Sequence, residues 1–95
     1  MMQYILLIHN NVTSDTTQEE WQYFFAIAGD SGLFKGGSEI GLREKIGNTQ
    51  SASSQHIAGY MRFDAPDKQA ILELLKLHPV VLHGGTVELC EMPKS

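Results

Sequence analysis

The chain has 95 residues, 42% of them hydrophobic, and its eleven acidic and seven basic residues give a net charge of −4. This length predicts a single domain over residues 1–95. The basic residues are scattered along an acidic chain, which argues against nucleic acid as a partner. No apolar segment approaches the ~20 residues needed to cross a bilayer, so no membrane partner is expected.

Cys90 is the only cysteine, so no disulfide within the chain is expected. Met1, Met2 and Gln3 lead into a short apolar run without a basic segment before it. A single cysteine and this N-terminal pattern together favour a reducing, cytoplasmic location.

The apolar run YILLIH predicts a first strand over residues 3–9. Successive side chains of a strand point to opposite faces, and here both sets are apolar. A sheet covered by helices on one face only should instead show polar residues at every second position. Both faces of this strand are therefore expected to be shielded from water.

The segment TTQEEWQYFFAIAGDSG predicts a helix over residues 16–31. Thr16 or Thr17 can cap it, and Glu19 or Glu20 can complete a capping box three residues later. Its apolar stripe needs a broad apolar surface such as a sheet face; the stripe consists of Trp21, Phe24, Phe25, Ile27 and Ala28.

Two adjacent glycines, Gly36 and Gly37, follow this helix and permit backbone conformations that other residues avoid. Beyond them Ile40, Leu42 and Ile46 predict a bent or bulged second strand. The polar segment NTQSASSQ then predicts a loop, either a hairpin tip or a mobile flap.

Residues 56–64 alternate clearly and predict a third strand, with Ile57, Gly59, Met61 and Phe63 on one face. Residues 64–78 predict a second helix, which Pro79 is expected to end. The segment TVELCEM predicts a fourth strand after the turn at Gly84 and Gly85.

This order predicts an α+β domain of the ferredoxin-like type, β-α-β-β-α-β. Two helices would cover one face of a four-stranded antiparallel sheet in which the first strand is central and antiparallel to the third. A second copy of the chain is the simplest cover for the other face, which makes the expected partner a homodimer that closes a dimeric α/β barrel. The alternative is an open sheet that binds a peptide or a lipid.

Several segments in this order resemble the YCII-related or DGPF-type domain family. They are MQYILLIH, GLFKGGSEIGL, AGYMRFDAPDKQAILELLKLHP and GGTVELCEM, and together they span nearly the whole chain. The resemblance implies a ferredoxin-like dimeric α/β barrel, similar in fold to muconolactone-isomerase-like proteins. The DGPFAETKE loop of one family branch has no counterpart here, where the chain reads NTQSASSQHIAGY.

Histidine is the side chain that most easily exchanges a proton near neutral pH, and His9 and His78 are the candidate catalytic residues. Each would need an acidic partner, for which Asp30, Glu39 and Asp64 are the candidates. The structural alternatives are a strand-end hydrogen bond for His9 and an interaction with a helix C-terminus for His78. His56 and His83 read as surface loop residues, and no pairing of His9 with His56 is predicted.

Arg43 and Arg62 are candidates for binding an anionic ligand, and Gly36 and Gly37 for a close approach to one. The alternatives are surface ion pairs and a tight turn. The histidine spacing and the lone Cys90 predict neither a metal site nor a cofactor.

Two functions remain open at this point. The first is a cofactor-independent acid–base enzyme, of the isomerase, lyase or dehydrohalogenase type, acting on a small aromatic or carboxylated metabolite. The second is a non-catalytic homodimeric scaffold or small-ligand-binding protein.

Overall fold

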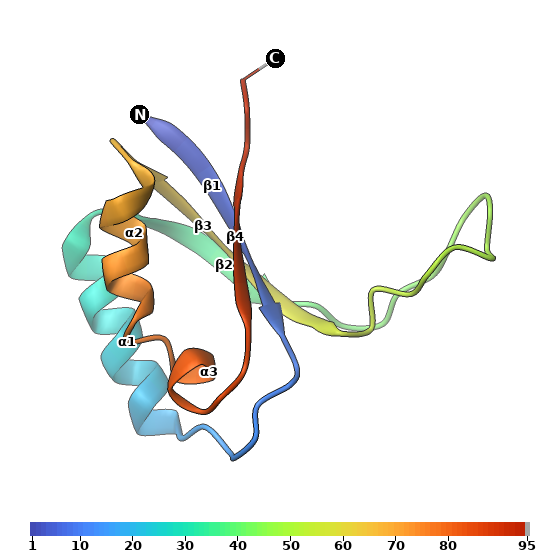
Figure 1. The fold of residues 1–95 in the computed structure, drawn as a ribbon, viewed down its shortest axis with the longest axis horizontal. Helices are drawn as coiled ribbons and strands as arrows, with labels where there is room; N and C mark the ends of the chain where they lie inside the picture. Colours follow the sequence, from blue (N-terminus) through green and yellow to red (C-terminus); the bar gives the residue numbers. More distant parts are fainter. Residues whose placement is uncertain (95) are drawn as a thin grey trace.

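A computed structural model describes residues 1–94 and has four antiparallel strands and three helices, as an α+β protein should. The sheet has the order β2-β3-β1-β4, so β1 is interior and antiparallel to β3, as predicted. All three helices lie on one side of the sheet (Figure 1). The elements are β1 (Met2–His9), α1 (Gln18–Ser31), β2 (Phe34–Glu39), β3 (Ile57–Ala65), α2 (Lys68–Leu75), α3 (Pro79–Leu82) and β4 (Val87–Glu91).

The core lies between the helices and the sheet. Tyr4 pairs with Phe63 and Leu6 with Met61 across β1 and β3, and all four side chains are buried. They pack with buried residues of all three helices: Phe24, Ala28, Ile71, Leu74, Leu75 and Val80. The predicted alternation of residues 56–64 is therefore correct, and β1 buries one of its two apolar sets of side chains on this face.

No helix formed by residues 1–94 covers the opposite face of the sheet, which we call the helix-free face (Figure 1). Ile5 and Leu7 of β1 lie on it, beside Cys90 and Tyr60, and these four side chains are half-buried. The single chain thus leaves part of an apolar strip exposed to water. Within residues 1–94, no helix has the length and apolarity to cross a membrane.

Helix α1 begins with the predicted capping box, at Thr17 and Glu20. The backbone N–H of Glu20 donates to Thr17 Oγ1 at 3.1 Å, and that of Thr17 donates to Glu20 Oε1 at 2.8 Å. These bonds satisfy two donors that a helix N-terminus otherwise leaves free. The helix ends at Ser31 and is capped by Gly32, whose φ of 73° is readily adopted only by glycine.

The prediction that Pro79 ends a helix over residues 64–78 is wrong. Helix α2 stops at Leu75, and Pro79 is the first residue of the short helix α3. Proline is well suited to a first helical position, because the N–H that it lacks would be unpaired there. The local signal of a proline is the same whether a helix stops before it or starts at it.

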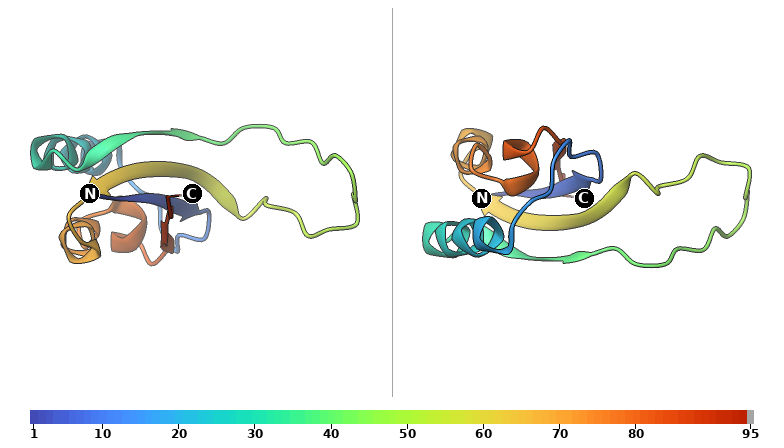
Figure 2. Two further views of the ribbon diagram at one scale, coloured as in Figure 1. Left: turned by 90° about the horizontal axis from the view of Figure 1, so that it is seen from above. Right: turned by 90° about the horizontal axis from the view of Figure 1, so that it is seen from below.

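The second strand ends earlier than predicted, at Glu39, and Ile40, Leu42 and Ile46 are not strand residues. Residues 40–56 instead form an arm that projects from the body of the domain (Figures 1 and 2). Leu42 and Ile46 are almost fully exposed on it, at 108% and 92%. The strand pattern fails here because these side chains find no sheet face within their own chain to pack against.

The glycine pair lies inside β2 rather than in a turn. The register of β2 against β3 shifts between Phe34 and Gly37, which marks a bulge. Gly36 has a φ of 110°, and a Cβ at Gly37 would overlap the backbone carbonyl of Tyr60. Glycine is therefore needed at Gly36 for its backbone conformation and at Gly37 for β2 to lie this close to β3.

Candidate functional site

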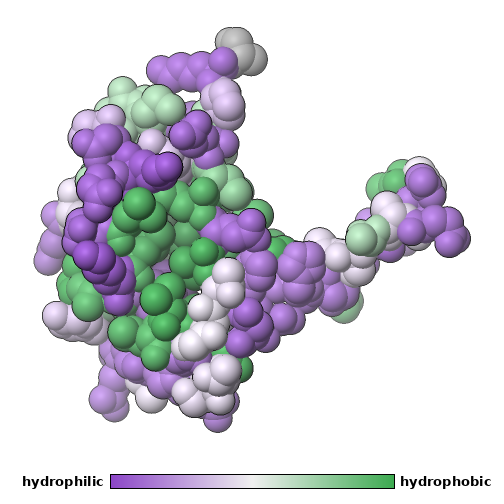
Figure 3. Space-filling model, in the orientation of Figure 1, coloured by the Kyte–Doolittle hydropathy of each residue, from purple (hydrophilic) through white to green (hydrophobic). Residues whose placement is uncertain are grey.

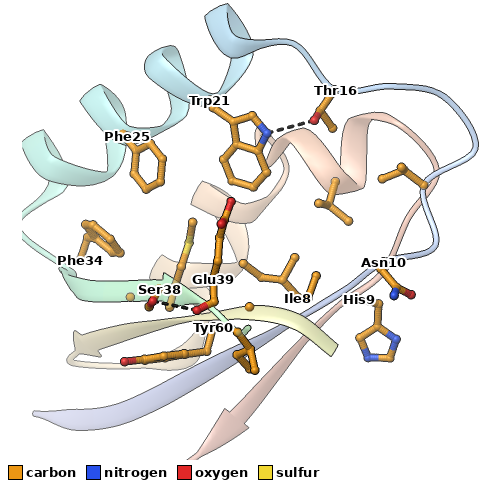
Figure 4. Close-up of a pocket in the computed structure, with 17 residues that line it drawn as sticks. Ile8, His9, Asn10, Thr16, Trp21, Phe25, Phe34, Ser38, Glu39 and Tyr60 are labelled. Atoms are coloured by element: carbon orange, nitrogen blue, oxygen red, sulfur yellow. Dashed lines mark hydrogen bonds between the residues drawn. The ribbon is translucent and has the colours of Figure 1, made fainter. Parts of the chain in front are cut away.

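A cavity of about 630 Å³ opens between α1 and the half of the sheet formed by β2, β3 and the end of β1. Trp21 and Phe25 of α1 and Phe34 of β2 stand around it (Figure 4). Its floor is apolar, with Ile8 and Met61 among the lining side chains.

The three aromatic rings follow from the local structure. Trp21 and Phe25 are four residues apart, so they share one face of α1, and their ring centroids lie 5.8 Å apart. Phe25 continues the row to Phe34, at 5.9 Å. The indole N–H of Trp21 donates to Thr16 Oγ1 at 3.0 Å, which fixes the ring against the cavity (Figure 4).

Of the Asp, Glu, Lys and Arg residues in the described range 1–94, Glu39 alone lines this cavity. Its side chain rises from the end of β2 toward Trp21 and Phe25 (Figure 4). Among residues 1–94, no side chain forms a hydrogen bond or an ion pair with its carboxylate; Ser38 bonds to its backbone carbonyl.

His9 lies at the rim of the cavity, but its imidazole points away from the aromatic rings (Figure 4). Its Nε2 lies 2.5 Å from Glu88 Oε1, and the imidazole side chain is only 18% exposed. The three acidic partners considered from the sequence do not contact it. Glu88 was missed because it lies 79 residues away, although β1 pairs Leu7 with Glu88 and so brings Glu88 near His9.

His9 and His56, for which the sequence predicted no pairing, lie close together. Their ring centroids are 5.3 Å apart in an edge-on arrangement. A register shift after Ile8 places His9 opposite Ile57, next to His56. No hydrogen bond joins the two imidazoles within the part of the chain that the structure describes.

His78, the other candidate, is completely buried in the core. Its imidazole packs edge-on against Trp21 and Phe24, with ring centroids 5.1 and 4.8 Å away. It caps the N-terminus of α3, where Nδ1 accepts from the N–H of Val80 at 3.1 Å, so the expected interaction with a helix C-terminus is wrong. Its Nε2 has no partner among the described residues, and burial lowers the pKa of His78 to about 4. The ring is therefore neutral at pH 7.

Neither candidate for anion binding lines the cavity. Arg43 belongs to the arm and donates to the backbone carbonyls of Ile40, Gly41 and Ser54. Arg62 is exposed on the helix-free face, opposite Ile5. Of the glycine pair, Gly37 lines the cavity and Gly36 does not.

His83 is half-buried rather than a free surface residue, and it joins two parts of the chain. Its Nδ1 lies 2.7 Å from Ser14 Oγ, and its Nε2 lies 2.8 Å from both carboxylate oxygens of Glu20. The hydrogen bonds from His83 and then from the Thr17 backbone lower the pKa of Glu20. Neither Ser14 nor His83 lines the cavity, and the backbone carbonyl of His83 also accepts from Thr13. This row of side chains therefore fastens the β1–α1 loop to the end of α3.

Within residues 1–94, no three or more His, Cys, Asp and Glu side chains are grouped so that they could hold a metal ion. A search of protein-family models and a search of curated proteins find no match to this chain.

Proposed function

We propose that this chain is a homodimeric protein that binds a small, largely apolar molecule in the cavity between α1 and the sheet. The observation that carries the proposal is the cavity itself. Its volume of about 630 Å³ lies within the range of roughly 300–1,000 Å³ that is typical of small-molecule sites. An apolar floor and three aromatic rings supply the surface that such a ligand would bury.

The homodimer is proposed from the apolar side chains that the single chain leaves uncovered. Ile5 and Leu7 form the centre of a strip on the helix-free face, and Arg62 and Glu88 flank it. Burial contributes about 25 cal/mol per Å² of apolar surface, so a few large side chains give several kcal/mol. A second sheet packed on this strip would close the dimeric α/β barrel.

Two further groups of exposed apolar side chains bear on where a second copy binds. One is the arm, with Leu42 and Ile46. The other lies over α2 and α3 beside β4 (Figure 3), where Val81 and Leu82 are 39% and 54% exposed. The helix-free face remains the proposed dimer interface, because its strip runs across three neighbouring strands, β3, β1 and β4.

The resemblance to the YCII-related or DGPF-type family supports the same proposal. The strand order β2-β3-β1-β4 is compatible with the ferredoxin-like arrangement, with α3 as a short addition to the second crossover. We therefore include both membership of this family and the ferredoxin-like fold in the proposal.

A second candidate function is the cofactor-independent acid–base enzyme of the isomerase, lyase or dehydrohalogenase type. The pair of His9 and Glu88 favours it, because a carboxylate that holds an imidazole can orient it as a general base. This pair lies on the helix-free side of the sheet, beside the proposed dimer interface. The enzyme ranks second as a candidate function because the imidazole of His9 is turned away from the cavity.

Fluorescence of Trp21, the only tryptophan, tests ligand binding directly. We expect small neutral aromatic probes such as 1-naphthol to change its emission in a saturable way. Phe25→Ala removes one lining ring and should weaken binding by about fivefold. Tyr23→Ala is the matched control, since Tyr23 is an exposed residue of α1 that does not line the cavity. Equal effects of the two substitutions, or no saturable change with any probe, would contradict the proposal.

A further inference from the structure

We propose that the ligand of this cavity is an organic cation: an ammonium group attached to an apolar, preferably aromatic, body. The inference rests on the proposed function, namely that the cavity binds a small molecule. It adds the charge of that molecule, which the sequence left open between aromatic and carboxylated metabolites.

The first argument is the arrangement of the rings. Trp21 and Phe25 are stacked with an interplanar angle of 29°, and Phe34 stands beside Phe25 at 47°. The face of an aromatic ring carries partial negative charge, so it attracts a cation and repels an anion. Three neighbouring rings around one cavity offer several such faces to the same ligand.

The second argument is the position of Glu39. Its carboxylate stands among the rings (Figure 4), and no cationic side chain of the described chain pairs with it. Gly59 faces Glu39 across β2 and β3, and its missing side chain keeps that position free of bulk. A carboxylate without a partner, at the edge of an apolar cavity, is complemented by a cationic group on the ligand.

The third argument is that, among residues 1–94, neither lysine nor arginine lines the cavity. The two arginines considered from the sequence, Arg43 and Arg62, lie elsewhere. A carboxylated ligand would meet both the like charge of Glu39 and the negative faces of the rings. The cavity therefore discriminates against anions and favours amines.

Three probes with the same phenylethyl body test this inference: phenethylamine as the cation, 2-phenylethanol as the neutral form and 3-phenylpropionate as the anion. Binding is followed by Trp21 fluorescence excited at a wavelength where the probes do not absorb. We expect phenethylamine to bind about tenfold more tightly than 2-phenylethanol, from one exposed ion pair and the cation–π contacts. The anion should bind more weakly than both.

Glu39→Gln should reduce the preference for the amine over the alcohol to about threefold, the part contributed by the rings. Glu44→Gln is the matched control, since Glu44 lies in the arm and does not line the cavity, and it should keep the full preference. The comparison of the three probes in the unmodified protein does not depend on the folding of either variant.

Equal binding of the three probes, or tightest binding of the anion, would overturn the inference and leave the proposed binding function standing. An amine preference that Glu39→Gln leaves unchanged would also overturn it. If neither these probes nor 1-naphthol bind, the proposed function itself fails.

Discussion

Acid should destabilise this protein through His78 before most of its carboxylates are protonated. The imidazole is fully buried between Trp21 and Phe24, and burial lowers its pKa from 6.5 to about 4. Between pH 6.5 and pH 4, His78 binds a proton in the unfolded chain but remains neutral in the folded chain. Stability is therefore fully present above pH 6.5 and falls as the pH is lowered toward 4.

The size of the effect follows from the two pKa values. Each pH unit between them is worth about 1.4 kcal/mol, so the free energy of unfolding falls by roughly 3 kcal/mol between pH 7.5 and pH 4. The free energy of unfolding of small domains is about 5–15 kcal/mol, so this loss is a measurable fraction of the total stability.

Urea unfolding of the wild type and of His78→Asn, measured at several pH values, isolates this contribution. Asparagine keeps an oxygen that can accept the hydrogen bond from Val80 at the start of α3, but it does not titrate. We expect the variant to be less stable by about 2 kcal/mol at pH 7.5, because it leaves a cavity. The other histidines and the carboxylates titrate in both proteins and cancel in the difference.

The wild type should lose its advantage as the pH falls: the two proteins should be equally stable near pH 5, and the variant should be the more stable by about 1 kcal/mol at pH 4. A stability difference that is the same at pH 7.5 and at pH 4.5 would refute the reasoning. It would mean that the buried ring accepts a proton in the folded state.

Two further predictions concern stability. Gly37→Ala should destabilise the domain by about 2 kcal/mol or more, because its Cβ would overlap the backbone of β3, whereas Gly29→Ala in α1 has free space and should be neutral or slightly stabilising in thermal melts. Glu20→Gln should flatten the fall of the melting temperature below pH 4.5, because Glu20 has a lowered pKa and its contribution is present above that pH and lost below it. Glu19→Gln, one residue away, is the control and should keep the steeper fall; equal profiles for the two variants would contradict this role of Glu20.

Local rules allowed much of the fold to be predicted from the sequence. The capping box of Thr17 and Glu20 depends on residues three apart, and the alternation of residues 57–63 depends on neighbours within one strand. The prediction for Pro79 failed because a proline can either end one helix or begin the next. The prediction for the arm failed because its leucine and isoleucine side chains follow the pattern of a strand, but no sheet of their own chain buries them.

The contacts of the site were less predictable because they join distant parts of the chain. His9 meets Glu88 only through the register of β1 and β4, and His83 meets Glu20 across 63 residues. The aromatic stripe of α1 was visible in the sequence, but it indicated core packing rather than a cavity wall. The position of Glu39 beside it depends on where β2 ends, and the sequence placed that end incorrectly.

Sedimentation equilibrium at micromolar concentration tests most directly whether a second copy covers the helix-free face. We predict a folded particle of twice 10.6 kDa. Leu7→Asp should reduce it to the single chain, whereas Leu82→Asp, on α3, should leave it intact. A wild-type protein that is folded and sediments at 10.6 kDa, or a dimer that Leu82→Asp breaks and Leu7→Asp does not, would contradict the proposed interface.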